Sequence, residues 1–306
     1  MKFSSFQELF DSMAGGQRKR TAVVWAEDDH TMEAAAEVCK AGCIAPIFIG
    51  RTQELEKRWK ELKVDFSPRF VPATSAEEAV KKAVEMARSG EAELIQKGLV
   101  ETAVIMRQIV HKENGLCQEG LLSHLTVVEL PNYHKLLGLT DCALLTYPTL
   151  EQKKEAIRNA LIFFHSVGYE DVKVGILAAV EKVNPKMPET VEAVQLKDAC
   201  IRGELPGSTV EGPISYDLAM VREAAEIKGY KSPVAGDADL LVVPNITAGN
   251  ILVKSLSYSA GGSTAAVVLG AKVPVAIASR SSPVRSKIMG LRLAAAMAQG
   301  LSDQRR

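Results

Sequence analysis

The residues best suited to chemistry lie in one short segment near the end of the chain. Three serines and one arginine stand between the apolar stretch 273–278 and Pro283: Ser279, Arg280, Ser281 and Ser282. The apolar stretch predicts a strand, and Ser followed by Pro is typical of the first residues of a helix. Arginine is suited to bidentate contact with phosphate, and serine hydroxyls add hydrogen bonds. The segment therefore indicates an anion-binding turn between a strand and a helix.

A second turn of this kind lies earlier in the chain. Residues 240–243 form a continuous apolar run of strand length, and Pro244 ends it before the polar loop 245–250. We expect a helix to begin near Asn250, so that its unpaired amides and the positive end of its dipole favour phosphate or carboxylate. Gly249 would let the backbone approach a ligand closely. One such turn alone is more often an ordinary strand–helix connection, but two in one chain favour an anion site.

Three longer motifs carry a family resemblance: ADLLVVPNITAGNILVKSLSY, GAKVPVAIASR and LAAVEKVNPKMPET. In combination they resemble the phosphate acyltransferase family, and the phosphate butyryltransferases more closely than the phosphate acetyltransferases. The resemblance covers most of the chain and is clearest from Gly120 onward. It implies transfer of a short acyl group (butyryl, propionyl or acetyl) in the reaction acyl-CoA + phosphate = acyl phosphate + CoA. Coenzyme A is then a substrate, with no bound cofactor and no metal.

The resemblance also implies roles for individual residues. The thiolate of bound CoA would attack the acyl phosphate carbonyl directly in a ternary complex, so no protein nucleophile is required. Ser279 would hydrogen-bond the reacting centre, and Arg280 would hold phosphate or stabilise developing charge. Arg107 would contact the substrate, although an exposed helical arginine explains that residue equally well. Six further residues are predicted to bind substrate: Thr247, Gly249, Asn250, Ser281, Asn184 and Lys186.

One position departs from the family pattern. The acetyltransferase branch has an aspartate seven residues after its catalytic serine, proposed to help deprotonate the thiol, and this chain has Ser286 there. A serine cannot be that base, and the butyryltransferase branch also lacks the carboxylate, so the base stays unassigned. A CoA thiol near its ordinary pKa ionises slightly at neutral pH, and a positive pocket would raise the ionised fraction.

Strand-length apolar runs alternate with amphipathic helices, which predicts an α/β fold. We place one domain at 1–147 and another at 148–284, with the last helix, 285–306, packing back on the first. The resemblance implies two doubly wound domains with a cleft between them, an architecture like that of isocitrate and isopropylmalate dehydrogenases. Strands 264–269 and 273–278 are joined by three residues. They should be antiparallel, because parallel strands need a long crossover.

Some local features are predicted from single residues. The last helix is expected to end at Gly300, which would cap it. Residues 121–130 and 141–146 each have the apolar pattern of a strand. Histidines are expected to be structural, and His124, at the start of the first of these strands, is the one most suited to join a site.

The composition limits the partners. Acidic and basic residues cancel at 37 each, so no global field draws the chain to nucleic acid or an anionic membrane. Five scattered cysteines argue against a disulfide framework and for reduced thiols in the cytoplasm. No segment reaches the roughly 18 apolar residues of a membrane span. The expected partners are small molecules (acyl-CoA, phosphate and acyl phosphate), and the resemblance adds a homodimer or higher homo-oligomer.

Two other interpretations stay open. One is a dehydrogenase of related fold, which would need grouped metal-binding aspartates and a nicotinamide site; the sequence shows neither these nor a strand-linked G-x-G-x-x-G. The other is a non-catalytic module that binds CoA or phosphate. Ser286 favours the binding module, whereas Ser279 and Arg280 oppose it.

Overall fold

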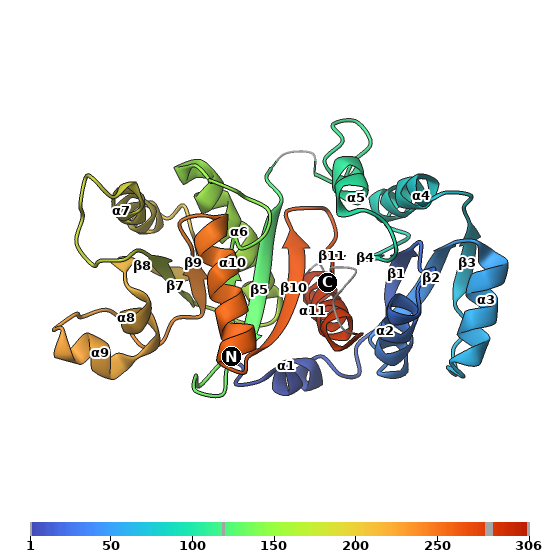
Figure 1. The fold of residues 1–306 in the computed structure, drawn as a ribbon, viewed down its shortest axis with the longest axis horizontal. Helices are drawn as coiled ribbons and strands as arrows, with labels where there is room; N and C mark the ends of the chain where they lie inside the picture. The colour runs from blue at the N-terminus through green and yellow to red at the C-terminus, as the bar shows by residue number, and fades with distance from the viewer. Residues whose placement is uncertain (1, 118–119, 279–283, 305–306) are drawn as a thin grey trace. The chain divides into compact units, whose positions relative to one another are not determined.

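The structure is a computed structural model of the chain, and it describes every residue except 1, 118–119, 279–283 and 305–306. The chain forms two compact units. We name the units by their place in the sequence. The central unit consists of Met1–Leu9 and Ser123–Thr264, and the flanking unit consists of Phe10–Leu122 and Ala265–Arg306, the stretches before and after Ser123–Thr264. Figure 1 shows most of the central unit in green to orange and the flanking unit in blue, cyan and red.

This division differs from the expected boundary after residue 147. Strand β6 (Leu137–Thr140) pairs in parallel with β9 (Leu240–Val242), and β5 (Ser123–Glu129) pairs with β6. These hydrogen bonds place β5 and β6 in the central unit. An apolar pattern indicates that a stretch is a strand without indicating its partner, which is why the boundary could not be placed from the sequence.

The flanking unit has a mostly parallel sheet with the strand order β3-β2-β1-β4-β11-β10. Its strands are β1 (Lys19–Val24), β2 (Ile44–Gly50), β3 (Arg69–Pro72), β4 (Leu94–Lys97), β10 (Ser263–Leu269) and β11 (Val275–Ala276). Strand β11 runs parallel to β4 and antiparallel to β10, with Val268 opposite Val275. The predicted antiparallel pairing of β10 and β11 is confirmed.

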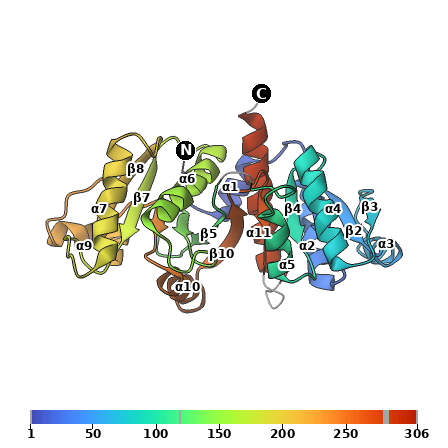
Figure 2. The same cartoon turned by 90° about the horizontal axis from the view of Figure 1, so that it is seen from above.

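Helices cover both faces of this sheet. They are α2 (Asp29–Lys40), α3 (Thr52–Glu61), α4 (Ala76–Ser89), α5 (Thr102–Ile109) and α11 (Val284–Asp303). Figures 1 and 2 show α4 and α5 on one face and α2 with α11 on the other. A short helix, α1 (Phe6–Ser12), lies where the chain passes from the central to the flanking unit.

Helix α11 does not end at Gly300 as predicted. It continues to Asp303, and Gly300 is buried and accepts a hydrogen bond from the Gln304 amide at 3.1 Å. Gly300 is therefore a buried residue within the helix and not a left-handed cap.

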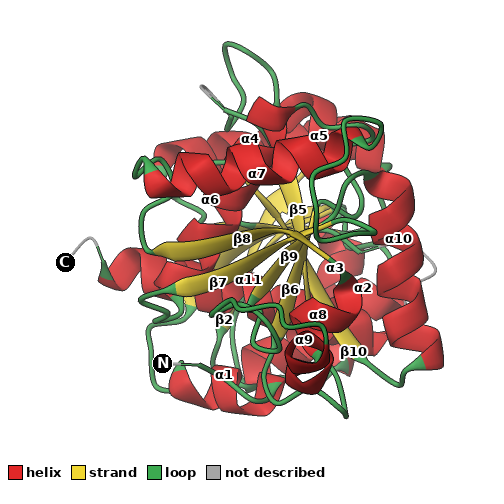
Figure 3. Ribbon diagram, turned by 90° about the vertical axis from the view of Figure 1, so that its left-hand side faces the viewer, coloured by secondary structure: helices red, strands yellow, loops and turns green. Residues whose placement is uncertain are grey.

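The central unit has the strand order β5-β6-β9-β7-β8, with β7 at Val172–Leu177 and β8 at Ser208–Ile214. Strand β5 is antiparallel to β6, and the other neighbours are parallel. Its helices are α6 (Leu150–Ser166), α7 (Pro188–Ile201), α8 (Tyr216–Met220), α9 (Arg222–Ile227) and α10 (Ile246–Lys254), which continues into the π-helical turn η1 (Ser255–Ser259). Figure 3 shows α6 and α7 on one side of the strands and α8 with α9 on the other.

This topology brings several chain segments to one edge of the central sheet. Strands β6, β9, β7 and β8 all end there because they are parallel, and the antiparallel β5 begins there. Ligands of open α/β sheets bind outside the carboxyl ends of the strands. The residues that follow these strands are therefore the candidates for a binding site.

Candidate active site

The turn after β9 begins with an asparagine that caps a helix. Asn245 has extended backbone angles, and its side-chain oxygen accepts a hydrogen bond from the Ala248 amide at 3.1 Å. Helix α10 therefore begins at Ile246, one turn before the predicted start near Asn250. The prediction was wrong because it read the small polar residues as a loop, whereas asparagine is a strong N-cap.

The three predicted substrate residues after β9 thus lie in the first two turns of α10. Thr247 is exposed, Gly249 is buried and Asn250 is partly buried. The positive end of the helix dipole falls on this turn, as the anion-site hypothesis requires. The structure brings these residues together on one helix at the carboxyl edge of the sheet.

Gly249 is needed for packing. A Cβ atom on this residue would lie 2.8 Å from Cγ2 of Val243 and 3.0 Å from Sγ of Cys142. Such contacts are closer than van der Waals packing allows, so glycine lets α10 approach the ends of β6 and β9. The side chain of Asn250 points back to the same region, with Nδ2 3.5 Å from the Cys142 carbonyl oxygen.

A buried carboxylate follows β6 at the same edge. Asp141 is 4% exposed, and its oxygens accept hydrogen bonds from three backbone amides: His124 at 2.7 Å, Ala143 at 2.9 Å and Leu144 at 2.7 Å. The predicted strand over 141–146 is wrong, because β6 ends at Thr140 and Asp141 starts a turn. Sequence analysis missed this carboxylate, although an acidic residue directly after a strand is a signal that could have found it.

His124 lies next to this carboxylate at the start of β5. Burial lowers the pKa of His124, and the negative charge of Asp141 opposes that shift. Nδ1 of the imidazole lies 3.5 Å from the hydroxyl of Thr126. The lowered pKa favours the neutral imidazole at neutral pH, a form that can both donate and accept a hydrogen bond.

The loop after β7 is folded by its own side chains. Oδ1 of Asn184 accepts a hydrogen bond from the Lys186 amide at 3.0 Å, and the Asn184 amide donates to the buried Thr190 hydroxyl at 2.9 Å. Lys186 is exposed. Because β7 is a neighbour of β9, both predicted residues lie at the same sheet edge as α10.

The remaining predicted residues belong to the flanking unit. Arg107 is exposed on α5, whose buried side carries Ile105 and Ile109. Ser279, Arg280 and Ser281 lie outside the described residues. Strand β11 ends at Ala276 and α11 begins at Val284, so the strand and the helix that the sequence predicted on either side of them are both present.

A buried lysine lies within one turn of the start of α11. Nζ of Lys287 donates to the Thr31 hydroxyl at 3.3 Å and lies 3.7 Å from Oδ1 of Asp28, which caps α2. The other oxygen of Asp28 is buried and has no hydrogen-bond partner among the described residues. Lys287 and Asp28 line a pocket of about 210 Å³ together with Asp29, His30, Gly98 and Leu99. The unpaired oxygen of Asp28 can accept a hydrogen bond from a ligand. No sequence pattern predicted this cluster.

No group of three or more His, Cys, Asp or Glu residues that could hold a metal occurs among the residues the structure describes. Within that same part, no helix is long and apolar enough to cross a membrane. Burial, with the nearby charge of Asp141, raises the pKa of the Cys142 thiol well above its ordinary range, which favours the neutral thiol over the nucleophilic thiolate.

The chain is similar to known proteins over most of its length. The family described as "Phosphate acetyl/butaryl transferase" matches residues 71–296. The phosphate butyryltransferase of Clostridium acetobutylicum is 35% identical over 295 residues, covering 96% of this chain and 98% of that protein. The phosphate acetyltransferase of Thermotoga maritima is 36% identical over 293 residues, covering 96% of this chain and 100% of that protein.

Solved structures agree with the fold. A branched-chain phosphotransacylase from Enterococcus faecalis V583 superposes with a TM-score of 0.81 and 30% identity, covering 92% of this chain and 99% of that chain. A 4-hydroxythreonine-4-phosphate dehydrogenase from Burkholderia phymatum shares the fold, with a TM-score of 0.56 and 14% identity over 90% of this chain and 98% of that chain. The predicted α/β fold of dehydrogenase-like architecture is confirmed.

Proposed function

The chain belongs to the phosphate acetyl/butyryl transferase family, and from this premise we propose that it moves a short acyl group between CoA and inorganic phosphate. The observation that carries this proposal is the near full-length likeness to phosphate acyltransferases. The capped turn of α10 at the carboxyl edge of the central sheet supports it, because a helix N-terminus favours phosphate. The protein is therefore an acyltransferase, with acyl-CoA, phosphate and acyl phosphate as small-molecule substrates.

The proposed reaction needs no covalent intermediate with the protein. The thiolate sulfur of CoA attacks the carbonyl carbon of the acyl phosphate, a C–S bond forms, and the bond from that carbon to the bridging oxygen breaks. Inorganic phosphate leaves with the electron pair. Ser279 donates a hydrogen bond to the reacting centre, and Arg280 binds the phosphate and stabilises the negative charge that develops.

Substrate binding is proposed to use seven residues. Thr247, Gly249 and Asn250 present the first turns of α10 to an anion, and Ser281 adds a hydroxyl. Asn184, Lys186 and Arg107 complete the proposed set. The exposed cationic side chains of Lys186 and Arg107 are accessible to the phosphate groups of CoA, which supports their inclusion.

The thiol needs no dedicated base in this proposal. Ser286 is partly buried on α11 and carries no carboxylate. A positive turn next to the thiol lowers the pKa of that thiol and raises its ionised fraction. We also propose a cytoplasmic homodimer that uses no bound cofactor; the five free cysteines support a reducing compartment.

The test follows the loss of free CoA thiol when purified protein is mixed with CoA and acetyl, propionyl or butyryl phosphate, without metal or nicotinamide. Turnover that requires both substrates supports the acyltransferase, and the fastest acyl phosphate gives the chain-length preference. If none of the three is consumed while CoA binds in a direct titration, the enzyme proposal is wrong and a non-catalytic CoA-binding module takes its place.

A further inference from the structure

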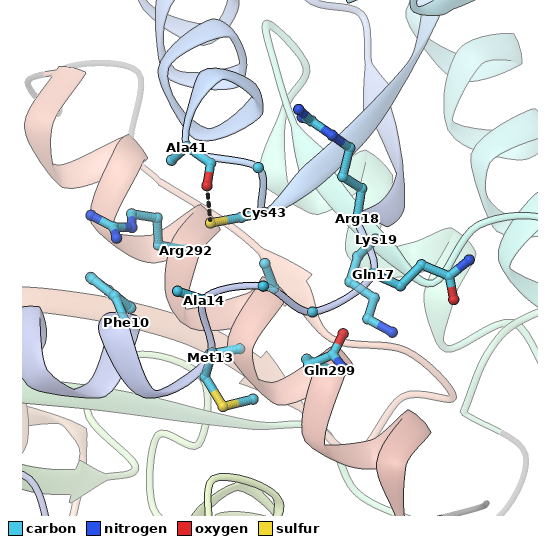
Figure 4. Close-up of a pocket in the computed structure, with 15 residues that line it drawn as sticks. Phe10, Met13, Ala14, Gln17, Arg18, Lys19, Ala41, Cys43, Arg292 and Gln299 are labelled. Atoms are coloured by element: carbon cyan, nitrogen blue, oxygen red, sulfur yellow. Dashed lines mark hydrogen bonds between the residues drawn. The ribbon is translucent and has the colours of Figure 1, made fainter.

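The flanking unit contains a second pocket, far from the carboxyl ends of its strands. It has a volume of about 260 Å³ and lies where β1 and β2 begin. Its walls are the end of α1 and the loop after it, the first residue of β1, the turn 41–43 and the second half of α11. Figure 4 shows this pocket with its lining side chains.

The pocket is suited to an anion. Three of its 15 lining residues are cationic (Arg18, Lys19 and Arg292), and none of the 15 is acidic. Two of these cations have partners. Arg18 donates to the Ile44 carbonyl at 3.3 Å. Lys19 donates to the Ser302 hydroxyl at 3.0 Å and forms an ion pair with Glu93 at 3.4 Å, so its charge is already balanced.

Arg292 differs from the other two cations. Its Nε is buried and has no hydrogen-bond partner among the described residues. The guanidinium lies over the ring of Phe10, with Cζ 4.1 Å from the ring centroid. The Cys43 thiol also interacts with the guanidinium. Stacking on an aromatic ring occupies one face of the guanidinium, and Nε at its edge stays available to a ligand. A buried cationic N–H without a partner is costly, and a carboxylate would satisfy it.

A second unpaired atom lies two helical turns further along α11. Nε2 of Gln299 donates to a carboxylate oxygen of Asp303 at 2.9 Å, and because a carboxylate only accepts, this bond fixes the amide orientation. Oε1 of Gln299 is then a buried acceptor with no partner among the described residues. Seven residues separate it from Arg292, so the two backbone positions lie roughly 10 Å apart along the helix.

Apolar side chains line the space between these two polar groups. Ala295 and Ala296 are buried on the intervening turns of α11, and Met13 and Ala14, in the loop after α1, line the same pocket. We propose that this pocket is a second ligand site, which binds a small linear organic acid bearing a terminal hydroxyl. The carboxylate binds Arg292, the methylene chain lies against the alanines, and the hydroxyl donates to Gln299.

This site is separate from the one proposed for acyl transfer. Strand β11 is parallel to β4, and β4 is parallel to β1, so β11 ends, at Ala276, at the sheet edge opposite the pocket. Binding at the pocket therefore does not depend on the proposed reaction and can be measured without substrates.

The test titrates the full chain calorimetrically with 6-hydroxyhexanoate, and in parallel with hexanoate and hexane-1,6-diol. We expect saturable binding of 6-hydroxyhexanoate, weaker binding of hexanoate, which lacks the donor, and none of the diol, which lacks the anion. Arg292→Gln should weaken the binding of 6-hydroxyhexanoate about tenfold or more, as expected for loss of a hydrogen bond to a charged group. The matched control Arg69→Gln removes an exposed arginine elsewhere in the same unit and should bind like the wild type.

A second variant tests the other end of the pocket. Gln299→Met keeps the length of the side chain and removes the acceptor. This variant should therefore bind 6-hydroxyhexanoate no more tightly than hexanoate. Thermal unfolding of each variant checks that it folds. The proposal is overturned if 6-hydroxyhexanoate shows no saturable binding to the wild type, or if folded Arg292→Gln binds it as tightly as the wild type does. It is also overturned if folded Gln299→Met still binds 6-hydroxyhexanoate more tightly than hexanoate.

Discussion

The carboxylate of Asp141 is predicted to hold together the turn that follows β6. It accepts three backbone hydrogen bonds, from the amides of His124, Ala143 and Leu144, at 2.7 to 2.9 Å. In Asp141→Asn the remaining oxygen can keep the two bonds to Ala143 and Leu144. The new NH2 group then faces the amide of His124, so two donors oppose each other inside the protein.

The cost follows from these contacts. One hydrogen bond to a charged group is lost, which is worth about 1.5–3 kcal/mol, and the His124 amide is left buried without an acceptor. The two remaining bonds become bonds to a neutral oxygen and weaken. We expect a loss of about 3 kcal/mol in the local stability of this turn. Since about 1.4 kcal/mol is a factor of ten, amide protection should fall roughly a hundredfold.

Hydrogen exchange is the suitable measurement because the two tryptophans, Trp25 and Trp59, both belong to the flanking unit. Their fluorescence would not report on the central unit directly. Exchange of the Ala143 and Leu144 amides is followed by mass spectrometry, with Asp198→Asn as a matched control, since Asp198 is exposed in the same unit. If the two amides in Asp141→Asn exchange within about threefold of the wild-type rate, the proposed role of the carboxylate is refuted.

Two further changes have expected outcomes. Arg280→Ala should remove most acyl transfer in the CoA thiol assay without changing thermal unfolding, and near-normal turnover in a folded variant would contradict its proposed role. At the opposite edge of the central sheet, burial opposes ionisation of Asp237, but hydrogen bonds led by that from Lys135 outweigh it and hold the pKa of Asp237 well below its usual range. A lowered folded-state pKa stabilises the protein above the unfolded value, about 3.9, and this stabilisation is lost as pH falls through the folded value. Urea unfolding from pH 7 to pH 3 should therefore show a steeper loss below about pH 4 in the wild type than in Asp237→Asn, which should be less stable at pH 7; equal slopes would contradict this.

Features that depend on neighbouring residues in the chain were predicted well. The α/β class and the antiparallel pairing of β10 and β11 followed from apolar runs and a short connection, both of which are local. The N-cap of α10, Asn245, is also a local sequence feature. It was missed because the small residues after it were interpreted as a loop. That error moved the start of the helix by one turn and left the residues of the turn unchanged.

Features that depend on partners distant in the sequence could not be predicted. Gly249 was assigned to ligand approach because a glycine in a turn permits it, yet the structure explains this glycine by the side chains of Val243 and Cys142, the latter more than a hundred residues away. Asp141 is similar, since one of its three amide partners, His124, belongs to a neighbouring strand. The role of a buried polar residue depends on the groups that the topology brings within hydrogen-bond distance of it. Strand order is part of this topology, and neither the period of the apolar residues nor their strand and helix propensities determine it. The sequence could therefore indicate which turns carry the candidate site, whereas the buried contacts that support those turns depend on the order of the strands.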